Sequence, residues 1–215
     1  MDAVTISANP VHRRVTGIGR TGEAAVYPQV LVPTVRLRTL ARRPEVVAVA
    51  VLGLLLRCWV LVTPSWNLFA DEAVTGLSAL DVAQRHFGIL IPANNYTALI
   101  ESYLFAPVVK VFGTHVVPLK LMPVLLWFVA SVLAGLVAGR LAGIRSAVCA
   151  FALLWLIPGA LLIVSTRAYL GYAGGLAVVM AAVLSLVVIV QEGRSRRRVV
   201  LAGALIGLAF MMHPI

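Results

Sequence analysis

Acidic side chains are scarce in this chain of 215 residues, which has eight Asp and Glu residues against 18 Lys and Arg. Charge of either sign is also rare, because 12% of the residues are charged and 61% are hydrophobic. Ordinary soluble domains are roughly a quarter charged and about half apolar. This composition excludes an ordinary soluble domain and indicates an integral membrane protein.

The chain also has few cysteines and histidines, and its amino terminus lacks the pattern of a cleaved signal peptide. The two cysteines, Cys58 and Cys149, lie inside apolar runs and lack the spacing of a metal site, so we interpret them as packing residues. The histidines form no ligand cluster with other residues, which leaves a divalent metal without support. The amino terminus has no apolar segment beside a small-residue cleavage site, so no cleaved signal peptide is predicted.

Long stretches without charge take the place of these features. Each is close to the roughly 20 residues that a helix needs to cross the hydrocarbon core. A further stretch, residues 44–63, is interrupted only by Arg57, whose side chain we expect to reach the headgroups from the end of its span. The sequence therefore predicts an all-α, polytopic membrane region over 44–215 with about five transmembrane helices. The four stretches without Asp, Glu, Lys or Arg are 121–139, 146–166, 168–191 and 199–215.

Arginine is concentrated before the first span and in two connections. By the positive-inside rule these segments are cytoplasmic, which predicts a multi-pass protein of the cell membrane with a cytoplasmic amino terminus. Residues 1–43 have no helical or strand period, so we expect a mostly disordered basic tail that contacts membrane lipids and not nucleic acid. The arginines concerned are Arg13, Arg14, Arg20, Arg36, Arg38, Arg42, Arg43, Arg140, Arg145, Arg194, Arg196, Arg197 and Arg198.

The outer connection, residues 64–120, is too long for a simple turn and too apolar for an ordinary loop. Asp71 is placed to N-cap a helix that runs to about Phe87, with Glu72 in its first turn. The segment that starts at Asn94 has apolar residues at intervals of three and four, which predicts an amphipathic helix lying in the membrane interface. The two carboxylates are therefore expected at headgroup depth, where a lipid-linked substrate presents its polar group.

Several motifs accompany this connection. The pattern W-x-L-x-x-D-E-A runs from Trp66 to Ala73, N-Y-x-x-x-x-E-x-Y-L runs from Asn95 to Leu104, "VFG" precedes the next span, and "HP" follows a later one. Over residues 57–215 the chain resembles the amino-terminal part of GT-C glycosyltransferases, in particular the protein mannosyltransferase and aminoarabinose transferase-like group. The resemblance implies a sugar donor on a polyprenyl phosphate, a role in the cell envelope, and a catalytic Asp-Glu pair, here Asp71 and Glu72.

An inverting sugar transfer needs a carboxylate that removes the proton of the acceptor hydroxyl, and Asp71 is the candidate base. A cation must hold the leaving phosphate. Arg167 lies between two charge-free stretches on the outer side and is the best candidate, with Lys110 and Lys120 behind it. The remaining candidates for substrate contact are Glu101, Tyr96, Tyr169 and Tyr172.

Each candidate also has a structural interpretation. Asp71 can be a helix cap without chemistry, Glu72 a complement to the helix dipole, and Arg167 with the tyrosines an interface anchor. Glu101 can pair with Lys110 or face water. At the level of the whole chain, the alternatives are a transporter or a non-catalytic membrane subunit, because membrane acids also mark ion pathways, and an inactive truncated remnant. The chain has fewer spans than the family and stops inside an apolar segment, so we expect it to be incomplete.

Overall fold

The computed structural model describes residues 35–63, 67–91, 94–98, 100–113, 115–169 and 171–212, with the backbone alone at 90, 91 and 94–98. They belong to one compact unit, Val32–Ile215. This unit is helical apart from a two-stranded ribbon, as the composition predicts. Its elements are α1 (Leu37–Ala41), α2 (Pro44–Leu61), α3 (Ala70–Ala83), β1 (Leu90–Ile91), β2 (Asn94–Ala98), α4 (Ile100–Phe112), α5 (Val116–Ala142), α6 (Ile144–Trp155), α7 (Ala160–Val164), α8 (Tyr172–Glu192) and α9 (Arg196–Met212).

Three of the described helices, α2, α5 and α8, are long and apolar enough to cross a membrane. They correspond to the first, second and fourth predicted spans. α5 begins before its charge-free stretch and includes Lys120, whose charge is compensated by a buried carboxylate described below. α9 has 17 residues and opens on three arginines. It covers the described part of the fifth predicted span, whose last residues, 213–215, lie outside the described ones.

The third predicted span, residues 146–166, is not a single helix. α6 ends at Trp155 after 12 residues, α7 begins at Ala160, and Pro158 and Gly159 lie between them. Proline lacks a backbone N–H and disfavours helical geometry at the residue before it. Gly159 has φ of 68°, a left-handed conformation that suits glycine. The lack of charge over this stretch reflects burial and an apolar surface, and the Pro-Gly pair interrupts the helix.

The expectation that Arg57 reaches the headgroups is wrong. It is fully buried between α2 and α6, with its Cζ 3.8 Å from the centre of the Trp155 ring. Its Nη1 donates hydrogen bonds to the carbonyl oxygens of Trp155 at 2.7 Å and Gly53 at 3.1 Å. A Cβ at position 53 would collide with the Trp155 indole, so glycine makes this stacking feasible. The buried guanidinium thus satisfies a carbonyl at the end of the interrupted helix α6.

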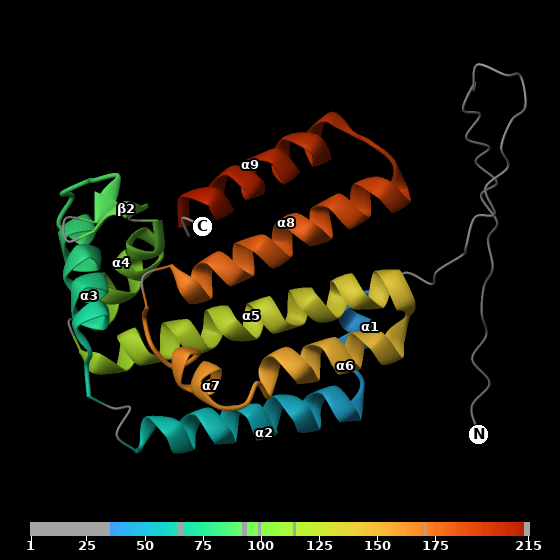
Figure 1. Ribbon diagram of the computed structural model, residues 1–215, viewed down its shortest axis with the longest axis horizontal. Coiled ribbons are helices and arrows are strands. Elements are labelled where there is room, and N and C mark those ends of the chain that lie inside the picture. Colours follow the sequence, from blue (N-terminus) through green and yellow to red (C-terminus); the bar gives the residue numbers. More distant parts are fainter. Residues whose placement is uncertain are drawn as a thin grey trace, which may run out of the picture. The chain divides into compact units, whose positions relative to one another are not determined.

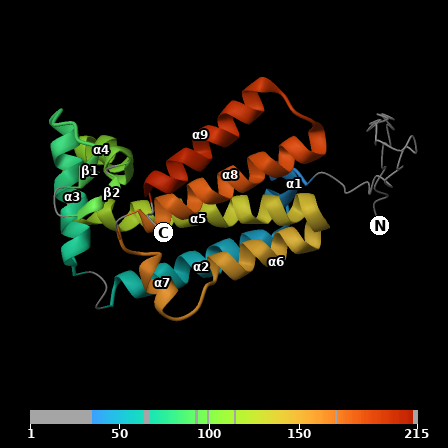
Figure 2. The ribbon, with the colours of Figure 1, turned by 45° about the horizontal axis from the view of Figure 1, so that its top comes forward.

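Successive helices of the bundle reverse direction (Figure 1). α5 lies beside α6 and α8, α9 lies beside α8, and α2 lies beside α6. Trp127, Phe151 and Trp155 form the centre of the main core, and Phe128 packs edge-on against the last two rings. This alternation places α1 and the α5–α6 and α8–α9 connections at one end, and α3 and α4 at the other (Figure 2). The arginines of the described connections are therefore separated from the acidic outer connection.

The packed unit begins earlier than the predicted end of the tail at residue 43. Val35 and Leu40 are buried in the main core, and α1 contacts α2 and α6. Glycine at positions 135 and 139 leaves room for these two side chains against α5. The predicted disorder of the preceding segment falls on residues outside the described ranges, apart from this packed end.

The outer connection folds differently from its predicted pair of helices. α3 ends at Ala83 and not near Phe87, because Arg85 has φ of 69°, which ends the helix. The second predicted helix begins only at Ile100, since Asn94–Ala98 is a strand that pairs antiparallel with β1. α3 and α4 lie across the end of α5 in both views (Figure 1, Figure 2). A small core holds them there, formed by Ala79, Phe105, Val109, Leu119 and Ala168.

Candidate functional site

The two adjacent acids, Asp71 and Glu72, occupy different environments in the first turn of α3. Asp71 is exposed and forms no ion pair with any described residue, whereas Glu72 is completely buried. The predicted N-cap role of Asp71 is wrong, because Phe69 is the N-cap residue and no side chain caps it. Instead, the Glu72 carboxylate accepts a hydrogen bond from the Phe69 amide at 3.1 Å, which is half of a capping box. Asp71 is thus left free on the surface.

Glu72 is the centre of a buried polar network that joins three segments. Both of its oxygens accept hydrogen bonds from Lys120 Nζ, at 2.8 and 2.7 Å, and both side chains are at most 1% exposed. Lys120 also donates to the carbonyl oxygen of Asn67 at 3.3 Å, and the Ala168 amide donates to Glu72 at 3.4 Å. The pair therefore connects the start of α3, the start of α5 and the loop after α7.

Arg167 lies in this loop and is 6% exposed. Its Cζ is 3.6 Å from the centre of the Phe69 ring, and the loop is held further by the Thr75 hydroxyl, which donates to the Ala168 carbonyl at 3.2 Å. Its Nε and Nη1 are buried and have no hydrogen-bond partner among the described residues. A buried guanidinium with two unused donors has hydrogen-bonding capacity left for an anion such as a phosphate or a carboxylate.

Phe69 links the candidate base to this cation. Its ring lies against Arg167, and its backbone begins the helix whose first turn carries Asp71. The loop and the helix end are therefore neighbours, although 96 positions separate Glu72 from Ala168 in the hydrogen bond that joins them. The structure thus places the first turn of α3, which carries Asp71 and Glu72, beside the Arg167 loop, with Lys120 paired to Glu72.

Glu101 is 4% exposed and does not pair with Lys110, which is exposed. Its carboxylate accepts hydrogen bonds from the amides of Gly171, at 2.5 Å, and Gly174, at 3.2 Å, at the start of α8. This satisfies helix donors and places a negative charge at the positive end of the helix dipole. Burial raises the pKa of Glu101 to about 7, while the two amide hydrogen bonds lower it in part. Glu101 is thus positioned to hold α8 and has little surface for substrate.

This raised pKa predicts a pH dependence of stability. Because the folded protein binds the proton more tightly than the unfolded chain, whose Glu101 has a pKa near its ordinary value of 4.5, the stabilisation is complete below about pH 4.5 and is lost as pH rises through about 7. We expect the free energy of unfolding to fall by about 1 to 3 kcal/mol over this range. Thermal unfolding in detergent at several pH values measures the slope.

In Glu101→Gln this part of the slope should disappear, whatever the absolute stability of the variant. Glu45→Gln is the matched control, since Glu45 is exposed on α2, and it should keep the slope of the parent protein. An unchanged slope in Glu101→Gln would mean that Glu101 does not titrate in this range.

Of the three tyrosines predicted to contact substrate, two lie together and the third lies in another element. Tyr169 and Tyr172 form an edge-to-face pair with ring centres 6.3 Å apart, next to the Arg167 loop. Tyr96 lies in β2 and not in a helix, and its side chain is outside the described part.

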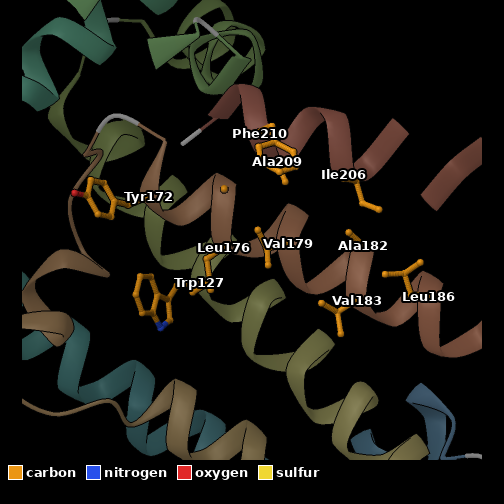
Figure 3. Close-up of a pocket in the computed structure, with 11 residues that line it drawn as sticks. Trp127, Tyr172, Leu176, Val179, Ala182, Val183, Leu186, Ile206, Ala209 and Phe210 are labelled. Atoms are coloured by element: carbon orange, nitrogen blue, oxygen red, sulfur yellow. The ribbon is translucent and has the colours of Figure 1, made fainter. Parts of the chain in front are cut away.

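Tyr172 also marks one end of an apolar groove of about 590 Å³ between α8 and α9 (Figure 3). The groove is hydrophobic along its length, so it matches an extended hydrocarbon chain in chemistry. Sequence reasoning missed it because its walls depend on how α8 and α9 pack against each other and against Trp127 of α5. The other labelled lining residues include Trp127, Leu176, Val179, Val183, Ile206 and Phe210.

The sequence favours Lys120 as a reserve cation for the phosphate, whereas the structure pairs it with Glu72, and the sequence does not single out Phe69. An isolated lysine at the start of an otherwise charge-free stretch was a usable signal, because a buried lysine needs a carboxylate partner. The pattern did not show which acid that partner is. Within the described ranges, no group of three or more His, Cys, Asp or Glu residues is arranged to bind a metal.

Comparisons with known proteins add no assignment. No family model matches the chain, and neither the curated proteins nor the solved structures include a significant match.

Proposed function

We propose that this chain is the amino-terminal part of a GT-C-like membrane glycosyltransferase, which transfers a sugar from a polyprenyl phosphate to an acceptor hydroxyl on the outer face. The observation that carries this proposal is the buried Arg167 guanidinium, whose unused Nε and Nη1 donors lie beside the start of the helix that presents Asp71. Anion binding and an accessible carboxylate are the two elements that the transfer requires.

In the proposed reaction Asp71 is the base. Its exposed carboxylate takes the proton of the acceptor hydroxyl while the acceptor oxygen forms a bond to the anomeric carbon. The bond between that carbon and the phosphate oxygen breaks, and its electron pair stays on the phosphate. Arg167 stabilises the negative charge of the leaving polyprenyl phosphate. Glu72 does not touch the reactants, because Lys120 neutralises it below the surface.

The apolar groove supports a lipid-linked donor. It begins at Tyr172, which is in ring contact with Tyr169, two residues beyond Arg167. A phosphate at Arg167 would have the nearby groove available for part of its hydrocarbon chain, whose burial supplies binding free energy of roughly 0.8 kcal/mol per CH₂. The sugar would then remain on the side of the acidic helix α3.

Binding of polyprenyl phosphate to the purified protein tests this assignment. Loss of hydrogen bonds to a charged group costs about 1.5 to 3 kcal/mol, so we expect Arg167→Gln to raise the Kd about 10- to 150-fold. Arg167→Lys should give a smaller increase, because lysine keeps the charge but not the paired donors. Lys110→Gln removes an exposed cation from α4 and should leave the Kd unchanged. Equal affinities in Arg167→Gln and the parent protein would contradict the proposed phosphate site.

We also propose that α6 with α7, and α9, lie in the membrane together with the three longer helices, with the arginine-rich end in the cytoplasm. The antiparallel alternation of the helices supports five crossings (Figure 1). A reporter fused after Ser195 should then be cytoplasmic, and one inserted near Asn94 should be external. Detection of both reporters on the same side would reject this topology.

A further inference from the structure

A second groove lies at the opposite end of the bundle from α3 and α4, between the starts of α2 and α6. Its volume is about 600 Å³, and it is lined by Arg43, Glu45, Ile144, Arg145, Val148 and Cys149. Both arginines are exposed, and Ile144 and Val148 provide an apolar wall on α6. The groove therefore combines a cationic rim with a hydrophobic side.

The two arginines of this groove have no partner in the described part of the chain, neither a hydrogen bond nor an ion pair of the side chain. Two other arginines at this end of the bundle are paired. Arg140 and Arg198 both pair with Glu192, at 2.8 and 2.7 Å. The donors of Arg43 and Arg145 are therefore available to a ligand, whereas those of Arg140 and Arg198 are partly used by Glu192.

The charge of the groove selects the class of ligand. Two guanidinium groups and the Glu45 carboxylate leave a net charge of about +1 when all three are ionised, which complements the single negative charge of a phosphodiester. Arginine side chains bind phosphate oxygens through paired donors. Because the groove is at the end of α2, which is long enough to span a membrane, and has an apolar wall on α6, a lipid fits it better than a free phosphate.

We propose that this groove binds the headgroup of an anionic phospholipid with one phosphodiester charge, such as phosphatidylglycerol. Arg43 and Arg145 hold the phosphate from the ends of two different helices, and an acyl chain packs along Ile144 and Val148. The lipid then bridges α2 and α6 at the arginine-rich end. This site is independent of the proposed transfer reaction, which is placed at the other end of the bundle.

Titration of the purified protein with phosphatidylglycerol or phosphatidylcholine, followed by native mass spectrometry, tests the site. We expect a tighter Kd for phosphatidylglycerol. Arg43→Gln/Arg145→Gln should raise that Kd about 10- to 30-fold, since each basic residue near a lipid surface contributes about 1 kcal/mol or slightly less, which is up to about fivefold. Competition with inorganic phosphate should have little effect, because it lacks the acyl chains.

Arg196→Gln/Arg197→Gln is the matched control, because it removes two arginines of α9 at the same end of the bundle without touching the groove. It should change the Kd less than about threefold, since only the general surface potential is altered. Equal losses in the two double variants would show non-specific attraction and overturn the proposal. Equal binding of the two lipids, or displacement by inorganic phosphate, would do so as well. Unchanged thermal unfolding of both variants would establish that they are folded.

Discussion

Asp71→Asn should lower sugar transfer from a polyprenyl phosphate by about 10²- to 10⁴-fold, the usual loss when a general base is removed. The variant should fold normally. Asp71 is exposed, its side chain does not cap α3, and it pairs with no described residue, so the structural cost is limited to a favourable helix-dipole interaction of about 0.3 to 1 kcal/mol. The rate of transfer in purified membranes and the thermal unfolding midpoint are the two measurements.

A matched control for this variant is Asp81→Asn. Asp81 is also exposed on α3, but it lies near the other end of the helix. Its neutralisation changes the net charge equally and should leave transfer within about twofold of the parent rate, because exposed charges about a Debye length apart are largely screened. Near-normal transfer by Asp71→Asn would remove Asp71 from the mechanism. Equal losses in both variants would indicate a general effect of charge.

Glu72→Gln should have the largest effect on stability, about 3 to 5 kcal/mol, because it leaves the Lys120 ammonium buried without its counter-ion. From the sequence alone, Glu72 looks like an exposed neighbour of Asp71, and its loss would be expected to be mild. Its burial beside Lys120 instead predicts a large loss of stability. Lys120→Met should be similarly harmful, since it leaves the carboxylate unpaired. Thermal or denaturant unfolding of the purified protein measures both effects.

The double variant Glu72→Gln/Lys120→Met provides the decisive comparison. It removes both charges, so we expect it to be more stable than either single variant, with a coupling free energy of at least about 1 kcal/mol. Strict additivity of the two single effects would mean that the ion pair does not contribute as a unit. Binding of polyprenyl phosphate by the double variant would further show whether the network is needed to place Arg167.

The parts of the fold that depend on local composition were predictable from the sequence. α2, α5 and α8 follow from long apolar stretches, and the gathering of most arginines at one end of the bundle follows from their positions along the chain. The break between α6 and α7 was visible in the sequence as the pair Pro158-Gly159. The charge-free length of residues 146–166 nevertheless favoured one continuous helix. Asn94–Ala98 forms a strand because it pairs with β1, which its apolar spacing does not reveal.

The environment of each charged residue was not predictable in the same way. Arg57 is buried because Trp155, 98 positions later, offers a ring and a carbonyl. Glu72 and Lys120 are 48 positions apart, and nothing local to either one selects the other. Residue type therefore predicted where charges gather, while the tertiary contacts determine which of two adjacent acids faces the surface.

The loop that carries Arg167 is held by two backbone amides that follow the arginine in the chain. The Ala168 amide donates to Glu72 on α3, and the Gly171 amide donates to Glu101 on α4. Because α3 and α4 also pack on each other, the loop is mechanically tied to both helices, and a displacement of the pair carries the guanidinium with it. The anchoring atoms belong to the main chain, so the side chains at 168 and 171 are constrained by space and backbone angle more than by chemistry. A larger residue at position 168 should therefore disturb the cation without removing any of its own contacts. At position 171, where φ is 81°, even a Cβ would collide with the Met212 carbonyl oxygen.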